Sequence, residues 1–365
     1  MDNILSSRPN RTDSNNSTHS NCQTDSTAIT EPEAKVINNP KSREVWIDIL
    51  RGITMLLVVY SHLVSSNSSL NSVFMTTRMP LFFFISGFFI YSLDYDFQLL
   101  WKRLKNRLTK QLYPTVILFS LFVIVFENCN FLMVYDDYKA GYWFTYVSVL
   151  YFLTLSPLLL LFSTLKLNDW GRILVFSAII LISIITHSVA SHANIFASDL
   201  SHLLSFEHYI SFLRYITCGC IFRILWNKYN NQLMSWILFT LSLAGFIICL
   251  RGHNSYISIL TGFFGIYIML FTIYNLTRKI NANNRIVIWL SFVGSMTLEI
   301  YLIHYFILST IHQFDFMESL KLHIVNTSWE FPIYICLSIV VAVMCLLIVK
   351  LLRHLKIYKY LFAKD

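Results

Sequence analysis

The segment WIDILRGITMLLVVYSHLV, residues 46–64, is long and apolar enough to cross a membrane as a helix, yet it contains Asp48, Arg51 and His62. Ionisable side chains in hydrocarbon are costly unless they face a partner or a water-filled cavity. With about 100° of rotation and 1.5 Å of rise per residue, Arg51 and His62 lie about 20° apart around a helix and about 16 Å apart along it. Asp48 falls within about 60° of the same face. The three residues form one polar stripe, which we expect to face a cavity.

Apolar runs of this kind continue along the chain. Of its 365 residues, 55% are hydrophobic and only 13% are charged, which is far from the composition of soluble proteins. Runs of about 17–25 apolar residues are typical of transmembrane helices. They are centred on residues 45–66, 76–93, 111–127, 142–164, 172–189, 208–226, 233–250, 255–275, 286–309 and 332–353. The sequence therefore predicts an all-α, polytopic integral membrane protein with about ten transmembrane helices.

Polar segments flank the predicted membrane domain at 44–356. Residues 1–43 are rich in Ser, Thr, Asn and Asp and poor in large apolar side chains, so they cannot bury enough surface to fold alone. We interpret them as a disordered cytoplasmic tail, and residues 357–365 as a basic cytoplasmic C-terminal tail. Because residues 1–43 lack the apolar core of a signal peptide, the first span is expected to serve as an uncleaved signal anchor.

The distribution of Lys and Arg predicts the orientation. If the N-terminus is cytoplasmic, the inside segments hold 22 of the 28 basic residues and the outside segments hold 4, with Arg51 and Arg214 inside spans. Such an excess of Lys and Arg in cytoplasmic loops is the usual rule. We expect both termini on the cytoplasmic side of the plasma membrane, which in bacteria is the inner membrane. The same bias explains most of the net charge of +8, so nucleic-acid binding is not expected.

Several common chemistries lack their residues. The sequence has no P-loop, no GxGxxG, no HExxH and no GxSxG motif. Its seven cysteines include no CxxC pair, and five of them lie in predicted spans, where small apolar packing is their ordinary role. No clustered set of metal ligands is visible, so no metal cofactor is expected.

The polar stripe carries a resemblance to a known family. The segment DILRGITMLLVVYSH, with ten residues between Arg51 and His62, resembles the first-helix motif of the acyltransferase-3 family, which are integral membrane enzymes that O-acylate sugars. Three further segments resemble characteristic family segments, namely MPLFFFISGF at 79–88, GYWF at 141–144 and SMTLEIYLIH at 295–304. The last is similar to the late helix of the branch that O-acetylates fucose and surface polysaccharides. The matches run from about residue 44 to 310 in the family's order, and the resemblance also implies ten spans.

One segment departs from the family pattern. The family carries Arg-x-x-Arg shortly before a proline at the start of its third helix, whereas this chain has RLTKQLYP from Arg107 to Pro114, so Lys110 replaces one arginine. The charge is kept, but Lys110 cannot grip a phosphate in a bidentate manner. We interpret the basic run at 101–110 as a cytoplasmic loop in which Arg107 and Lys110 bind acyl-CoA. A plain positive-inside loop that contacts lipid headgroups is the alternative.

Acyl transfer requires a base for the acceptor hydroxyl. Neutral imidazole has a suitable pKa near pH 7, so His62 is the candidate general base. Ser86 or Arg51 could donate a hydrogen bond to the developing oxyanion. Alternatively, His62 and Ser86 are helix-packing residues, and Arg51 anchors the helix near the interface. Asp48 is a candidate substrate-binding residue, or a helix-start residue that pairs with Arg51.

Three later residues complete the candidate site as substrate-binding groups. Glu299 lies within an apolar span, and Arg214 in another span is a possible structural partner. His304 matches the family's late histidine and follows Tyr301 on one helix face, although a packing role fits equally well. Trp143 is a candidate acceptor contact or an interfacial anchor.

These features favour a membrane O-acyltransferase. It would move an acyl group, most simply acetyl, from cytoplasmic acyl-CoA to a hydroxyl of an extracytoplasmic or lipid-linked sugar or polysaccharide. The co-substrate would be acetyl-CoA, and the other partners would be the acceptor and membrane lipids. The alternative is a secondary transporter or exporter, because ten spans with buried ionisable groups also suit alternating access. A membrane scaffold would leave the stripe of Asp48, Arg51 and His62 unexplained.

Overall fold

A computed structural model describes residues 44–363 except 93–94, 229–231, 251–254 and 282, and it leaves out the side chains of 227–228, 255 and 315–316. Contacts divide the chain at Arg43, and only the unit that begins at Glu44 is described below. The expected N-terminal tail at 1–43 and the last two residues of the expected C-terminal tail lie outside the described residues.

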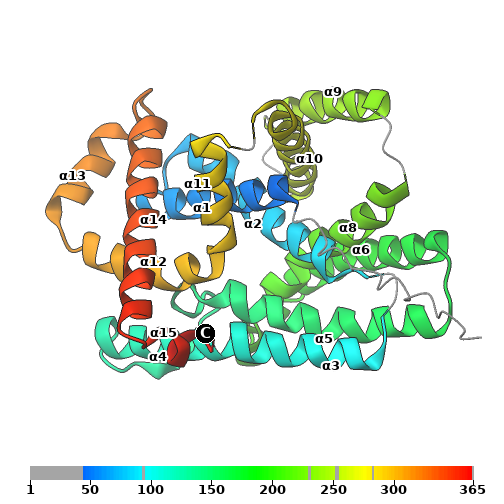
Figure 1. Ribbon diagram of the computed structural model, residues 1–365, viewed down its shortest axis with the longest axis horizontal. Coiled ribbons are helices and arrows are strands. Elements are labelled where there is room, and N and C mark those ends of the chain that lie inside the picture. Colours follow the sequence, from blue (N-terminus) through cyan, green and yellow to red (C-terminus); the bar gives the residue numbers. More distant parts are fainter. Residues whose placement is uncertain (1–43, 93–94, 229–231, 251–254, 282, 364–365) are drawn as a thin grey trace, which may run out of the picture. The chain divides into compact units, whose positions relative to one another are not determined.

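The described part of the chain is helical and contains no strand (Figure 1). Its α-helices are α1 (Val45–Leu63), α2 (Ser69–Ile90), α3 (Phe97–Arg107), α4 (Tyr113–Phe126), α5 (Trp143–Thr164), α6 (Asp169–His192), α7 (Asp199–Leu204), α8 (Phe206–Lys228), α9 (Gln232–Cys249), α10 (Ser255–Lys279), α11 (Arg285–Ser295), α12 (Thr297–Ile311), α13 (Asp315–Ile324), α14 (Glu330–His354) and α15 (Tyr358–Phe362). Four shorter helical turns are η1 (Leu108–Leu112), η2 (Phe131–Tyr135), η3 (Lys139–Gly141) and η4 (Ile195–Ala197). Within the described ranges, nine helical segments are long and apolar enough to cross a membrane, and the bent pair α11–α12 is a tenth candidate. The predicted all-α polytopic architecture is confirmed.

Helix α1 occupies the centre of the packing. Two thirds of its apolar window is buried, the largest share of any candidate span in the described residues. It contacts α2, α10, α11, α12 and α14. Its polar stripe is therefore surrounded by other helices and does not face lipid.

Helices α1 and α11 cross with their backbones in direct contact. A Cβ placed on Gly294 would lie 1.7 Å from the carbonyl oxygen of Asp48, and one on Gly52 would lie 2.3 Å from the carbonyl oxygen of Leu290. Since real Cβ contacts are never this short, both positions require glycine. The crossing brings the end of α11 against the polar stripe of α1.

The chain bends sharply after α11. Met296 has non-helical backbone angles (φ −107°, ψ 19°), and α11 and α12 meet at 81°. The expectation of one continuous span over 286–309 is therefore wrong in shape. The bend directs the first residue of α12, Thr297, toward Arg51, whose Nη2 donates a 2.8 Å hydrogen bond to the Thr297 hydroxyl.

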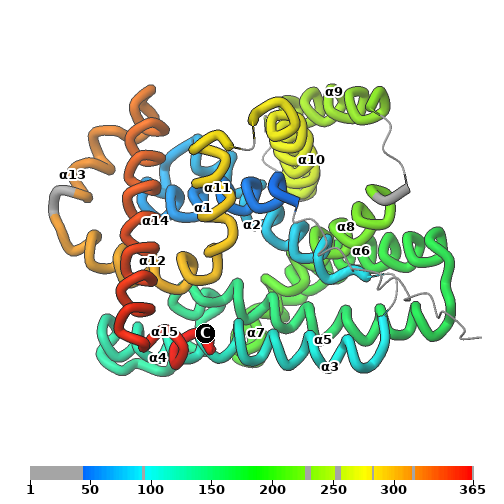
Figure 2. The backbone as a smooth tube through the Cα atoms, viewed as in Figure 1, coloured from blue at the N-terminus to red at the C-terminus, as the bar shows by residue number. Residues whose placement is uncertain are grey.

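The basic run at 101–110 is helical rather than a loop, which corrects the sequence-based interpretation. Helices α3, η1 and α4 form one run from Phe97 to Phe126, which is continuous in the backbone trace (Figure 2). At 1.5 Å per residue, its length is about 45 Å, compared with about 30 Å for the hydrocarbon core of a bilayer. The basic residues occupy the excess length.

The η1 turn has a local cause in Pro114. A proline within a helix lacks an N–H group and its ring clashes with the carbonyl four residues earlier. Here the five residues Leu108–Leu112, which include the carbonyl four residues before Pro114, widen into a π-helical turn that ends two residues before the proline. Such turns are frequent at functional sites, and this one contains Lys110 and Gln111.

The glycine crossing generates a stability prediction. We expect Gly294→Ala to lower the thermal unfolding midpoint and the yield of monodisperse protein, because a forced contact in a packed interior costs about 1–3 kcal/mol or more. Gly171→Ala is the matched control, since its nearest new contact is the flexible tip of the Asn168 side chain at 3.1 Å. Equal midpoints for the two variants would contradict the crossing.

Candidate active site

A cavity of about 590 Å³ with basic walls lies between α1, α2, the α3–η1 run, α5 and the α11–α12 bend. Its cations are Arg51, Arg103, Arg107 and Lys110. The last three are spaced by four and three residues, which places them on one face of a helix. We call it the basic cavity. Its charge suits an anionic ligand.

Polar contacts fix the direction of the arginines in the basic cavity. Arg107 donates through Nη1 to the Gln111 side-chain oxygen at 2.5 Å, and the Gln111 amide donates to the Thr145 carbonyl at 3.2 Å. Arg103 Nη1 donates to the Ile90 carbonyl at 2.9 Å. These bonds hold both guanidinium groups with uncharged acceptors, and among the described residues no carboxylate pairs with either group, so their positive charge is kept.

Arg51 lies at the other wall of the basic cavity. Besides its bond to Thr297, its Nη1 is 3.7 Å from a carboxylate oxygen of Asp48. Asp48 is buried behind Arg51 and does not line the cavity. The structure therefore gives Asp48 the position of an orienting partner for Arg51.

Ser86 and Glu299 also line the basic cavity. The Ser86 hydroxyl donates to the Phe82 carbonyl at 2.9 Å, one turn back on its own helix. Glu299 accepts a 2.8 Å hydrogen bond from the Tyr358 hydroxyl of α15, while Arg214 lines a different cavity. The expected Glu299–Arg214 pair is thus not formed.

His62 lines a second cavity, of about 550 Å³, that we call the histidine cavity. Its Nε2 atom lies 3.4 Å from the hydroxyl of Tyr305. Arg78, Glu207 and His208 line the same space. The histidine cavity therefore combines imidazoles, phenols, carboxylates and a guanidinium.

His304 lies behind His62 and is fully buried. The two ring centroids are 5.5 Å apart, and the His304 ring is 4.1 Å from that of Tyr305. Its Nδ1 atom is 2.6 Å from the carbonyl oxygen of Tyr301, which only accepts, so we assign the proton of the neutral ring to Nδ1. The other nitrogen, Nε2, is buried and has no hydrogen-bond partner among the described residues.

Trp143 forms part of the wall of the histidine cavity and is buried, so it is not an exposed interfacial anchor. Its ring centroid lies 4.2 Å from that of His208 and 5.5 Å from that of Phe212. These contacts hold the His208 ring against the cavity wall.

Tyr301 borders both cavities. Its hydroxyl donates to the Gly141 carbonyl at 2.5 Å, and its ring centroid is 5.3 Å from that of Phe144. Phe144 in turn lies 5.4 Å from Phe82. We call Phe82, Phe144 and Tyr301 the aromatic septum, because Tyr301 lines both cavities and the other two rings line the basic cavity beside it. Gly141 has a φ of +91°, and a Cβ there would lie 2.1 Å from the Tyr305 ring.

The structure therefore divides the candidate residues into two groups. The basic cavity holds Arg51, Ser86, Arg107, Lys110 and Glu299, and the histidine cavity holds His62 and Trp143, with His304 behind it. Because His62 lies beyond the septum, neither Ser86 nor Arg51 is placed beside it. Their expected role as oxyanion donors next to His62 does not fit this arrangement.

Sequence reasoning missed Arg78 and Tyr305. Arg78 lies in the third turn of α2, where its Nη1 donates to Asn71 at 3.4 Å and its Nε is buried without a partner among the described residues. A charged residue next to an apolar run was the available signal for Arg78. Tyr305 gave none, since tyrosine is common in this sequence.

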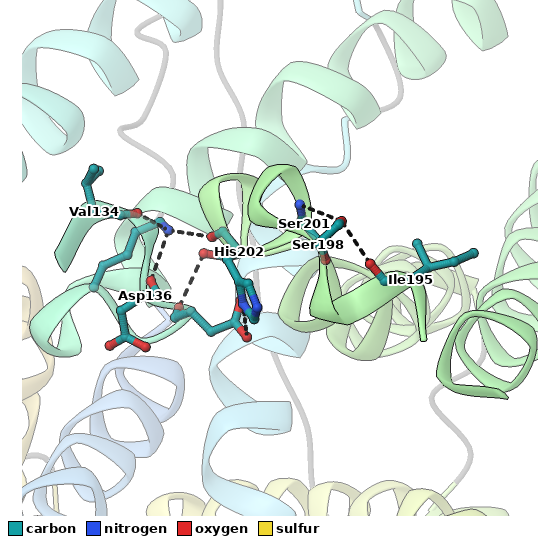
Figure 3. A network of polar contacts seen from close by, with 9 residues as sticks. Val134, Asp136, Ile195, Ser198, Ser201 and His202 are labelled. Atoms are coloured by element: carbon teal, nitrogen blue, oxygen red, sulfur yellow. Dashed lines mark hydrogen bonds and ion pairs between the residues drawn. The ribbon is translucent and has the colours of Figure 1, made fainter. Parts of the chain in front are cut away.

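Two loops at the rim of the histidine cavity are joined by Lys139. Its ammonium donates to the carbonyls of Val134 (2.9 Å), Asp136 (3.2 Å) and His202 (2.9 Å), so all three of its protons are used. Figure 3 shows this network, in which His202 also pairs with Asp137 at 2.9 Å. Burial lowers the pKa of the Lys139 amine, and the nearby carboxylates of Asp137 and Asp136 oppose that effect.

A family model described as an acyltransferase domain matches residues 44–347, which include both cavities and the septum. The chain belongs to the acyltransferase-3 family. It is therefore a membrane acyltransferase, which uses an acyl donor and an acceptor. No curated protein and no solved structure matches the chain with significance. Among the residues that the structure describes, no group of three or more His, Cys, Asp or Glu side chains is placed to hold a metal ion.

The Lys139 network predicts coupled rim loops. Lys139→Met keeps the length of the side chain but leaves three carbonyls without their donor, which costs about 1–3 kcal/mol for each buried group. We expect faster deuterium uptake at 131–141 and also at 195–204, measured by hydrogen exchange. Lys166→Met, at an exposed position, is the control. An increase confined to 131–141 would show that Lys139 does not join the loops.

Proposed function

We propose that this acyltransferase moves an acyl group, most simply acetyl, from acyl-CoA in the basic cavity to a sugar hydroxyl in the histidine cavity. The observation that carries the proposal is that Tyr301 borders both cavities, so a donor and an acceptor bound on opposite sides would meet at one side chain. Family membership supplies the reaction class. The cations of the basic cavity would bind the donor, and the imidazoles lie in the cavity proposed for the acceptor.

The basic cavity suits the phosphates of CoA. Arginine binds phosphate through two parallel N–H···O bonds, whereas lysine binds as a point charge. Arg103 and Arg107 point into the cavity on bonds to uncharged groups, and Lys110 is exposed at its edge. The excess of Lys and Arg on the predicted cytoplasmic side supports an orientation in which this cavity opens toward the cytoplasm, where acyl-CoA is made. We also propose that both termini lie in the cytoplasm and that the enzyme resides in the plasma membrane.

The acceptor would then enter from the opposite side. About 16 Å of helix α1 separates Arg51 from His62, so the acyl thioester must extend from the phosphates toward the septum. A sugar that is part of an extracytoplasmic or lipid-linked glycan has hydroxyls that Glu207, His208 and Arg78 could hydrogen-bond. The histidine cavity is therefore the proposed acceptor site, with Trp143 in its wall.

His62 is the proposed general base. As the acceptor oxygen attacks the thioester carbonyl, Nε2 of His62 takes the hydroxyl proton. The attack forms the C–O bond of the ester, and the C–S bond of the thioester then breaks. The CoA thiolate receives the proton from His62 and leaves as the free thiol. The oxyanion needs a hydrogen-bond donor close to His62. We propose Tyr305 for this role instead of Ser86 or Arg51, because its hydroxyl lies 3.4 Å from Nε2 of His62.

The first functional prediction tests the base. His62→Gln keeps a hydrogen-bonding side chain but cannot accept a proton at neutral pH, so acyl transfer should fall about 10²- to 10⁴-fold. Consumption of acetyl-CoA by purified protein with an envelope glycan preparation measures the rate. His323→Gln, an exposed histidine on α13, is the matched control. Near wild-type transfer by folded His62→Gln protein would refute the mechanism, whereas loss of folding in both His62→Gln and His62→Ala would assign His62 to packing.

The second functional prediction tests the donor cavity. Arg107→Ala should raise the KM for acetyl-CoA about 10- to 100-fold, which is the size expected for a lost charge-assisted contact. Lys110→Arg should be tolerated or lower the KM, since it adds a bidentate group. Arg285→Ala, an exposed arginine outside the cavity, should leave the KM unchanged. A KM shift of the same size in Arg285→Ala and Arg107→Ala would remove the donor assignment.

A further inference from the structure

A third cavity, of about 660 Å³, lies between α2, α6, α8 and α10. Arg214 of α8 lines it, and we call it the Arg214 cavity. It shares Met75, Ser211 and Phe212 with the histidine cavity, so the two are neighbours on the same side of the protein. The proposed acyl transfer gives the Arg214 cavity no task.

Arg214 is only 5% exposed, and its Nε and Nη1 atoms are buried without a hydrogen-bond partner among the described residues. The described residues that line the cavity include no Asp or Glu. The guanidinium carbon lies 5.5 Å from the ring centroid of Tyr215, and this contact brings no carboxylate to the guanidinium. Arginine stays charged in proteins, so a buried guanidinium without an acceptor is costly. A bound anion would remove this cost.

The rest of the lining offers hydrogen-bonding groups of the type that bind an oxyanion. His187, Ser188 and His192 come from α6, and Tyr256 comes from α10. The Ser188 hydroxyl lies 3.2 Å from that of Tyr256, so the two helices meet there through polar groups. With Arg214, they provide more donors than the two oxygens of a carboxylate require. A phosphate, with its larger number of oxygens, uses them better.

The depth of the cavity indicates an amphiphilic ligand. Arg214 lies eight residues into α8, and His187 lies five residues before the end of α6, which are about 12 Å and 8 Å from the helix ends. In helices about 35 Å long, these depths lie inside a hydrocarbon core of about 30 Å, so a ligand that binds there must reach below the lipid headgroups. Ile184 and Ile259 also line the cavity and give one part of it an apolar wall.

We propose that the Arg214 cavity binds the phosphate ester of an amphiphile. Arg214 pairs with two phosphate oxygens, the hydroxyls and imidazoles of α6 and α10 bind the others, and the hydrocarbon tail leaves along Ile184 and Ile259. The same chemistry has two sources, a phospholipid of the surrounding membrane and a polyprenyl phosphate that carries a glycan. The proposal stands whether or not the neighbouring histidine cavity transfers an acyl group.

Native mass spectrometry of the full-length protein in detergent tests the binding. The probes are dioleoyl phosphatidylglycerol, farnesyl phosphate, inorganic phosphate and, as a tail without phosphate, dioleoylglycerol. We expect a retained adduct with at least one of the first two and none with dioleoylglycerol. Arg214→Gln should reduce that adduct at least tenfold, Arg214→Lys should keep part of it, and Arg278→Gln, an exposed arginine on α10, should not change it.

The two amphiphiles distinguish the source. A stronger farnesyl phosphate adduct assigns the site to a lipid-linked phosphate, and a stronger phosphatidylglycerol adduct assigns it to a membrane lipid. Binding of inorganic phosphate alone, or equal adducts in wild type and Arg214→Gln, would overturn the proposal.

Thermal unfolding separates binding from a structural role. Because Arg214→Gln removes an unpaired buried charge, its delipidated form should melt no lower than the delipidated wild type. If Arg214→Gln unfolds while Arg214→Lys is stable and retains no amphiphile, Arg214 is structural and the proposal fails. His187→Phe, which removes a second lining group and leaves Arg214 in place, should also weaken the adduct.

Discussion

The backbone contact between α1 and α11 is the constraint on which the rest of the site depends. Gly52 and Gly294 let the two helices cross without side chains between them. The chain then turns at Met296, and α12 begins beside Arg51. Since α12 contains Tyr301, His304 and Tyr305, this one crossing sets the septum and the surroundings of His62 relative to the polar stripe of α1. A larger side chain at the crossing would therefore displace residues in both cavities.

Buried cations in this protein are accommodated in different ways, and the differences separate structure from ligand binding. Lys139 uses all its protons on carbonyls, so it only joins two loops. Arg107 has an uncharged partner, so its contacts satisfy one N–H group without cancelling its charge. Arg214 has two buried N–H groups without an acceptor among the described residues. The more N–H donors a buried cation leaves without an acceptor, the more free energy it gains when an external anion binds.

The sequence was sufficient where one element alone carries the signal. The spans follow from apolar length, and the stripe of Asp48, Arg51 and His62 follows from the period of a single helix. It was insufficient where two elements act together. The bend at Met296 depends on the contact of α11 with α1. Glu299 accepts a hydrogen bond from Tyr358, which belongs to a short helix without a strong sequence pattern. The 101–110 run was misread as a loop because its charges hide the helical continuity with α4.

The neighbouring helices change the interpretation of the polar stripe from one site to two. On an isolated helix, Arg51 and His62 share a face and suggest one site. In the structure, Met55 borders the basic cavity and Val58 borders the histidine cavity, while Tyr301 closes the space between them. The two polar ends of one helix therefore line different cavities. An acyl group that passes between them must cross an apolar, aromatic layer, and that layer is also what keeps water from the proposed transfer step. The same separation keeps Arg51 away from His62, so a group that stabilises charge there would have to come from the lining of the histidine cavity, such as Tyr305 of α12 or Arg78 of α2.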